Sequence, residues 1–206
     1  KTIKVLNPKE VVFEGGRELE LDAVSEVPRY YVCNAYGGCG IYRAPGTAVK
    51  EAYDTSGIVT NDRGVTVWLK GNRVSRNQIM AIKEESVTEQ KNSLAVCLDN
   101  ILRHAGITRN TEYDLAQGKT ATTILSENMT GVQVLDLSGC TLDAVLYYVN
   151  QDIPVLAILE DGEAVLVTGF NEFNVVIMEP ATGKLYKKGM NDATAWFAEN
   201  GNHFIT

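Results

Sequence analysis

The chain has 206 residues, of which 45% are hydrophobic and 22% charged, and its formal net charge is −7 at pH 7. This composition predicts a packed globular fold with one sizeable core or two modest ones. The 19 lysines and arginines form no run, so we do not expect a nucleic-acid-binding surface. No apolar stretch approaches the roughly 20 residues of a membrane-spanning helix, so no such span is expected in these residues.

The sequence begins at Lys1 and not at methionine, so we expect that an upstream piece has been removed. We therefore predict a secreted or cell-surface bacterial protein. The four cysteines contain no Cys-x-x-Cys pair and the two histidines lie about a hundred residues apart, so neither a metal site nor a cofactor is expected. Cys33 and Cys39 flank a glycine-rich loop, where they form either a disulfide or two buried free thiols.

The sequence pattern of residues 1–85 predicts a small α+β subdomain. Turn signals at Asn7-Pro8 and Gly15-Gly16 separate short strands near the start. The later part reads as a strand, a loop, a helix and a hairpin, at Arg29–Ala35, Gly37–Gly40, Pro45–Tyr53 and Gly57–Leu69. Its aromatic residues either pack in the core and across strands or line a ligand groove; they are Tyr30, Tyr31, Tyr36, Tyr42 and Trp68.

A second domain is expected from residue 86 to residue 206, with the boundary near Glu85. Its main element is a helix that begins with Ser93 as the N-cap and ends before Gly106. Apolar residues at spacings of three and four predict that one helix face is buried; they are Leu94, Cys97, Leu98, Ile101, Leu102 and Ala105. One or two short helical turns are expected between Thr108 and Thr130.

The rest of this domain predicts a helix followed by an antiparallel meander. Ser138–Thr141 caps the helix. Three apolar strands follow, at Pro154–Leu159, Ala164–Gly169 and Val175–Glu179. A short strand, a final helix and an edge strand complete the chain, at Lys184–Lys187, Asn191–Glu199 and His203–Ile205.

This order of elements resembles the papain-like cysteine peptidases, and several motifs resemble the bacteriocin-processing peptidases that cleave double-glycine leaders. The helix Asn92–Gly106 is similar to their nucleophile helix, and Asp152-Ile153-Pro154-Val155 looks like their Gly-x-Pro-Val segment. Ala164–Phe170 looks like their His-x-Val-Val-x-x-Gly-Tyr strand, and Glu179-Pro180 matches their Asp-Pro. The resemblance covers about residues 86–206 and implies a papain-like α+β domain, with a central helix packed on an antiparallel sheet.

The resemblance implies a catalytic triad whose residue types have changed. Ser93 stands at the position of the nucleophilic cysteine, Glu163 at that of the histidine and Glu179 at that of the orienting acid. Gln90 precedes Ser93 by three residues, whereas the family places its oxyanion-hole glutamine about six residues before the nucleophile. Cys97 is an alternative nucleophile, although the helical pattern puts it on the apolar face, where a thiol is usually inert.

Each of these residues also has a purely structural interpretation. Ser93 is explained as a helix cap, Glu163 as a solvated turn residue and Glu179 as a carboxylate at the end of a strand. His104 is expected at the surface, and His203 is a displaced base only if the last strand pairs beside the meander.

Three functions are compatible with this pattern. The first is a non-catalytic module that binds a peptide or protein segment in the former cleft, which the N-terminal subdomain helps to shape or cover. The alternative is an active cysteine peptidase or amidase that uses Cys97, or a cysteine at position 93 that has been changed to serine. The third is a cell-surface structural domain without a ligand.

Overall fold

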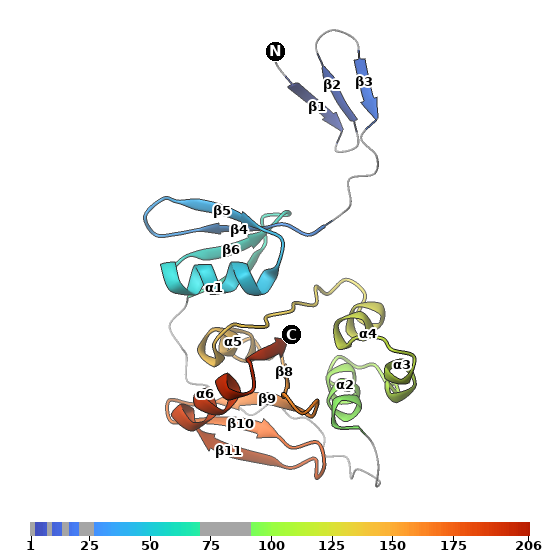
Figure 1. The fold of residues 1–206 in the computed structure, drawn as a ribbon, viewed down its shortest axis with the longest axis vertical. Helices are drawn as coiled ribbons and strands as arrows, with labels where there is room; N and C mark the ends of the chain where they lie inside the picture. Colours follow the sequence, from blue (N-terminus) through green and yellow to red (C-terminus); the bar gives the residue numbers. More distant parts are fainter. Residues whose placement is uncertain (1–2, 8–9, 14–16, 21–26, 71–91) are drawn as a thin grey trace.

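The computed structural model describes residues 3–7, 10–13, 17–20, 27–70 and 92–206 (Figure 1), and up to residue 20 it describes the backbone alone. The predicted boundary near Glu85 and the candidate oxyanion residue Gln90 lie outside these ranges, so both stay predictions.

The short strands expected near the start are present and form a sheet of their own. Strands β1 (Ile3–Asn7), β2 (Glu10–Phe13) and β3 (Arg17–Glu20) pair antiparallel in the order β1-β2-β3.

A second sheet of four antiparallel strands follows, in the order β5-β4-β6-β7. One helix packs against it and buries Gly46, Ala48, Val49 and Ala52. One strand was not predicted: β5 begins at Cys39, within the loop expected at Gly37–Gly40. The elements are β4 (Tyr30–Cys33), β5 (Cys39–Tyr42), α1 (Pro45–Thr55), β6 (Ile58–Asn61) and β7 (Thr66–Leu69).

The later part of the chain contains the predicted meander. A five-stranded antiparallel sheet has the order β11-β10-β9-β8-β12, so the last strand returns to pair beside β8, as expected. The elements are α2 (Ser93–His104), α3 (Glu112–Ala116), α4 (Ala121–Asn128), α5 (Leu142–Val149), β8 (Val155–Ile158), β9 (Ala164–Phe170), β10 (Asn174–Met178), β11 (Leu185–Gly189), α6 (Met190–Glu199) and β12 (His203–Ile205).

Strand β9 is the centre of this part of the molecule. All seven of its residues are buried, so both faces of the strand are covered. Helices α2 and α5 each pack against β8 and β9, and α6 packs against α5, β10 and β11. We therefore place α2 on one face of β9 and α5 on the other. The predicted α+β class, with a helix packed on an antiparallel sheet, is confirmed.

The start of α2 differs from the prediction by one residue. Asn92, not Ser93, is the N-cap, and its side chain accepts a hydrogen bond from the backbone N–H of Leu94 at 2.8 Å. Asparagine and serine both cap helices well, so the sequence alone does not choose between neighbours. Ser93 is therefore the first helical residue, and its hydroxyl is available for another partner.

The four-stranded unit, residues 27–70, is attached on the α5 side. Trp68 Nε1 donates to the carbonyl of Ala144 at 3.0 Å, and Tyr148 Oη donates to that of Val67 at 3.1 Å. Every described hydrogen bond between residues 27–70 and the later chain ends within residues 133–148. The expectation that the N-terminal subdomain helps to shape or cover the former cleft stays a prediction, since part of that subdomain lies outside the described residues.

Candidate functional site

Ser93 is held against the strand that follows the candidate base position. It is half-buried at the start of α2, and its Oγ accepts a hydrogen bond from the backbone N–H of Ala164 at 2.9 Å. Ala164 is the first residue of β9 and directly follows Glu163. The bond therefore brings the candidate nucleophile position and the candidate base position together, although 71 residues separate the bonded pair.

Glu163 lies in the tight turn between β8 and β9, and its side chain is exposed. Its N–H donates to Asp161 Oδ1 at 3.0 Å, and its carbonyl accepts from Leu159 N at 2.8 Å. Gly162 has a φ of +83°, a backbone conformation that glycine adopts without strain. The turn thus fixes the backbone of Glu163 and leaves its carboxylate in solvent.

Glu179 lies at the same end of the sheet as Glu163. Strand β10 ends at Met178, which pairs with Leu166 of β9. Because the two strands are antiparallel, Glu179, the residue after β10, lies toward the start of β9. The exposed carboxylate of Glu179 accepts a hydrogen bond from Thr182 Oγ1 at 2.8 Å. The structure therefore brings Ser93, Glu163 and Glu179 to one end of the five-stranded sheet.

Cys97 lies one turn after Ser93 and is fully buried. Its burial, and secondarily the charge of Glu163, raises the pKa of the thiol well above its ordinary value. Catalytic cysteines have the opposite environment, one that lowers the pKa and favours the thiolate. The prediction that Cys97 packs on the apolar face of the helix is confirmed.

Neither histidine joins this group. His104 is exposed at the opposite end of α2, with Nε2 3.3 Å from the carbonyl oxygen of Asp152. His203 does lie on a strand beside the meander, where it pairs with Ile158, which in turn pairs with Ala164. Two strand spacings, about 10 Å, thus separate it from Ala164. Its ring lies close to Gly201, where a Cβ atom would meet Nε2 at 2.8 Å.

The four cysteines fall into two classes. Cys33 and Cys39 form a disulfide between the directly paired positions of β4 and β5, which resolves the choice that the sequence left open. Cys97 and Cys140 are free and buried, and burial raises the pKa of Cys140 to about 12. No group of three His, Cys, Asp or Glu side chains that would suit a metal ion occurs in the part of the chain that the structure describes.

A buried polar contact behind α2 escaped the sequence analysis. Asp99 is 5% exposed, and its Oδ1 accepts a hydrogen bond from the backbone N–H of Thr111 at 2.9 Å. Thr111 Oγ1 in turn donates to the carbonyl of Ala95 at 3.2 Å. These bonds fix the chain after α2 against the helix. The only signal in the sequence was a charged residue directly after the apolar run Leu94–Leu98.

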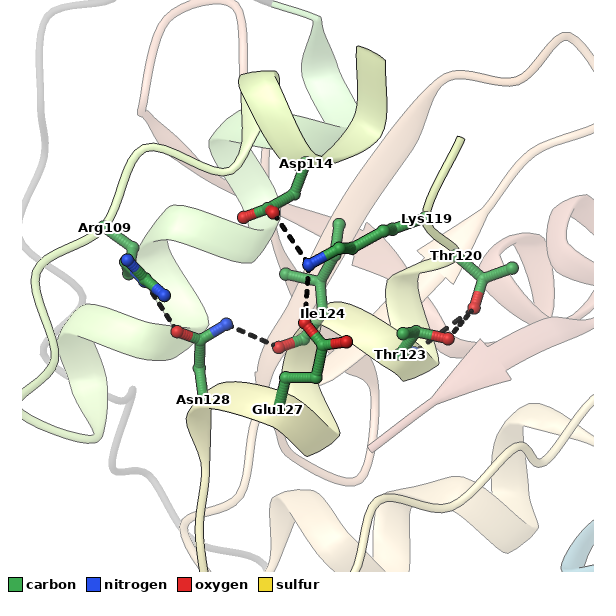
Figure 2. Close-up of polar contacts among 8 residues, drawn as sticks. All are labelled: Arg109, Asp114, Lys119, Thr120, Thr123, Ile124, Glu127 and Asn128. Carbon is green, nitrogen blue, oxygen red and sulfur yellow. Dashed lines mark hydrogen bonds and ion pairs between the residues drawn. The ribbon is translucent and has the colours of Figure 1, made fainter. Parts of the chain in front are cut away.

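Helices α3 and α4 are joined by polar contacts at the surface (Figure 2). Lys119 lies between Asp114 of α3 and Glu127 of α4, with Nζ–oxygen distances of 3.1 and 2.6 Å. Arg109 Nε donates to Asn128 Oδ1 at 2.6 Å. Because α4 packs against α2, this pair of helices supports the α2 side of the sheet. The prediction of short helical turns here is confirmed.

Comparisons with known proteins define the fold. No family model matches the chain, and no curated protein does. A solved structure of a candidate C39-like peptidase from Bacillus anthracis matches with a TM-score of 0.51 over 63% of this chain and 96% of that one. The fold is that of a C39-like peptidase. At 12% sequence identity the similarity establishes the fold alone, so the resemblance drawn from residues 86–206 holds at the level of a peptidase-like domain.

One further property follows from the helices. Within the ranges that the structure describes, no helix is both long and apolar enough to cross a lipid bilayer.

Proposed function

We propose that the C39-like part of the chain is a non-catalytic module that binds an extended peptide or protein segment at the surface around Ser93, Glu163 and Glu179. One observation carries the proposal: these three positions gather at one end of the sheet, where Ser93 bonds to the residue next to Glu163. The residue types at these positions do not form the Cys/His pair of a cysteine peptidase.

The chemistry of these side chains argues against catalysis. A serine hydroxyl needs a base within hydrogen-bond reach, and a carboxylate is a far weaker base than an imidazole. The Ser93 oxygen already accepts a hydrogen bond from Ala164. The nearby thiol of Cys97 is buried and held in its protonated form, so it does not replace the missing nucleophile.

The same surface suits binding. Glu163 and Glu179 are exposed and Ser93 is half-buried, so these polar side chains remain accessible to a partner. Extended peptides bind chiefly through main-chain hydrogen bonds, with side-chain contacts adding specificity. Loss of the nucleophile and base therefore does not remove the means of holding a peptide.

The disulfide supports a location outside the reducing cytoplasm. Disulfides persist mainly in oxidising compartments, and Cys33 and Cys39 are both exposed. The proposed module thus acts at the cell surface or after secretion.

A first experiment tests catalysis. The purified protein is incubated with a mixed peptide library and the products are analysed by mass spectrometry. We expect no cleavage from the wild type. Cleavage that disappears in Ser93→Ala or Cys97→Ala would overturn the proposal and establish the active-peptidase alternative.

Restoring the family's residue types provides a positive control. In the double variant Ser93→Cys/Glu163→His, an imidazole is returned beside a thiol at a helix start, which favours the thiolate. We expect iodoacetamide to alkylate position 93 of this variant at pH 6.5 much faster than in Ser93→Cys alone. The single variant also tests the alternative in which position 93 originally carried cysteine, since that alternative requires Ser93→Cys to cleave peptides.

A second experiment tests binding. Immobilised random dodecapeptides are probed with the wild type and with Ser93→Trp, whose ring would block the proposed surface. The matched control is Ser126→Trp, at an exposed serine of α4. We expect a set of peptides that the wild type and Ser126→Trp both bind to be lost with Ser93→Trp. Equal binding by the two variants would exclude this surface.

A further inference from the structure

Strand β5 is an open sheet edge. In the order β5-β4-β6-β7 it pairs with β4 alone among the described strands, and Figure 1 shows it at the border of that sheet. At the other border, the carbonyl of Val67 in β7 is already used by the hydroxyl of Tyr148. An added strand therefore has its accessible edge at β5.

The register identifies which backbone groups face outward. The Cα atoms of Cys33 and Cys39 are 4.2 Å apart, the spacing of a pair whose backbone groups do not bond to each other. The next pair toward the turn does bond, since Asn34 N donates to the carbonyl of Gly38 at 2.9 Å. Because the two kinds of pair alternate, the N–H and C=O groups of Cys39 and Ile41 point away from β4, toward the open edge.

The outer face of this sheet, opposite α1, is apolar. Ile41 of β5 is 64% exposed, and Ile58 and Leu69 continue the face at 48% and 37%. The register pairs Cys33 with Ile58 and Ile58 with Leu69, so the apolar strip runs from the disulfide across to β7. Exposed edges are usually protected by charged residues. Edge strand β11 carries Lys187 and Lys188, whereas β5 carries no charge.

The edge is also held rigid. The disulfide closes the β4–β5 hairpin, and the side chain of Asn34 accepts hydrogen bonds from the backbone N–H groups of Tyr36 and Gly38. A fixed edge loses little conformational entropy when a strand is added, which favours binding.

Two arginines lie at the other end of the hairpin. The pairing of Tyr30 with Tyr42 puts Arg29 and Arg43, the residues just outside that pair, at the same end. Both are exposed, and no acidic partner for either occurs among the described residues. The pairing of Tyr30 with Asn61 puts Asp62 at this end too, on the β6 side of Arg29, so Arg43 on the edge strand is the cation next to the open edge.

We propose that β5 is a docking edge for an extended peptide segment that carries apolar residues at alternate positions and a carboxylate beside Arg29 and Arg43. The segment pairs with the outward groups of Cys39 and Ile41, and its apolar residues extend the strip formed by Ile41 and Ile58. A second copy of the chain fits less well. If β5 paired antiparallel with its own copy, Cys39 opposite Ile41, Arg43 would face Gly37, which offers no carboxylate.

The test uses the peptide Asp-Val-Thr-Val-Thr-Val, labelled with fluorescein at its C-terminus, and fluorescence anisotropy. The variant Ile41→Pro removes an outward N–H without removing a bond to β4, and proline is tolerated at strand edges. Ile41→Val is the matched control that keeps the N–H. We expect Ile41→Pro to weaken binding about tenfold relative to Ile41→Val, the effect of losing one main-chain hydrogen bond. Equal affinity of the two variants would overturn the proposal.

Two further arms keep the test independent of how the proline variant folds. Peptides methylated on alternate backbone nitrogens are offered to the wild type: one alternating set should abolish binding and the other should preserve it, and equal binding by both sets would overturn the proposal. Arg43→Gln should weaken the aspartate peptide but not its asparagine counterpart. If the wild type formed a dimer that Ile41→Pro converts to a monomer, a second copy of the chain would cover the β5 edge, and the proposal of a peptide at this edge would be overturned. Ser93→Trp should leave this binding unchanged, which separates it from the function proposed above.

Discussion

The two faces of β9 differ in how the rest of the chain is attached to them. On the α5 face, the ring of Trp68 has centroid distances of 6.2 Å to Tyr53 and 6.1 Å to Tyr147, and its N–H bonds to the carbonyl of Ala144. On the α2 face, the start of the helix is tied to β9 by the hydroxyl of Ser93, and the two carboxylates near it point into solvent.

The contacts that stabilise the fold and the residues of the candidate site therefore lie on different faces of β9. The buried aromatic contacts of the α5 face join residues 27–70 to the later chain. The exposed residues on the α2 face contribute little to packing, so their types can change while the fold stays the same.

The largest expected effect comes from Trp68→Ala on the α5 face. This variant removes a ring that is 2% exposed and leaves the carbonyl of Ala144 without its donor. We expect the free energy of unfolding to fall by about 3–5 kcal/mol, measured by urea denaturation followed by circular dichroism. Tyr36→Ala, at a side chain that is 93% exposed, is the control and should leave it unchanged. If both variants lost a similar free energy of unfolding, the contacts on the α5 face would not be the main source of stability.

The second effect concerns the pH dependence of stability. The pKa of Cys140 is raised from 9.0 to about 12 by burial, so between these values the unfolded state releases the thiol proton and the folded state keeps it. The contribution of this thiol to the free energy of unfolding is fully present below about pH 9. It is lost at about 1.4 kcal/mol per pH unit as the pH rises from about 9 to about 12. Urea denaturation at pH 8.5, 9.5 and 10.5 should show the decline. The free energy of unfolding should fall less steeply with pH in Cys140→Ala than in the wild type. An identical pH dependence in the two proteins would show that the Cys140 thiol is not its cause.

On the α2 face, Ser93→Ala should have a smaller effect. It removes the acceptor for the N–H of Ala164, so we expect the free energy of unfolding to fall by about 1 kcal/mol in the same assay. Ser126→Ala, at an exposed serine of α4, is the control. A loss as large as that of Trp68→Ala would remove the distinction between the two faces.

The smallest effects are expected at the surface of α3 and α4. Thr120→Ala removes the N-cap of α4, whose side chain accepts from Thr123 N at 3.2 Å, and should lower the free energy of unfolding by about 0.5 kcal/mol. Lys119→Met removes the exposed ion pairs with Asp114 and Glu127 and should cost less, because surface pairs are screened by water and salt. Thermal melts at low and high salt would test this, and a larger loss for Lys119→Met at both salt concentrations would contradict it.

The elements that the sequence predicted well are those with local causes. The meander follows from three apolar runs separated by turn residues, and the α2 helix from apolar spacing of three and four. Strand β5 was missed because four residues that include Gly40 give almost no strand signal. The N-cap was assigned to Ser93 rather than Asn92, since neighbouring residues with equal capping ability differ only in their tertiary partners.

The sequence by itself determined the α+β class and the order of the later elements, and it predicts that Ser93, Glu163 and Glu179 stand at the positions of a triad. The tertiary structure decided which distant groups meet: Cys33 with Cys39, Ser93 with Ala164, and the four-stranded unit with α5. The physical reason is that helix and strand patterns repeat within a few residues, whereas these contacts join positions up to 90 residues apart. Their geometry depends on how whole layers pack, which no local pattern encodes.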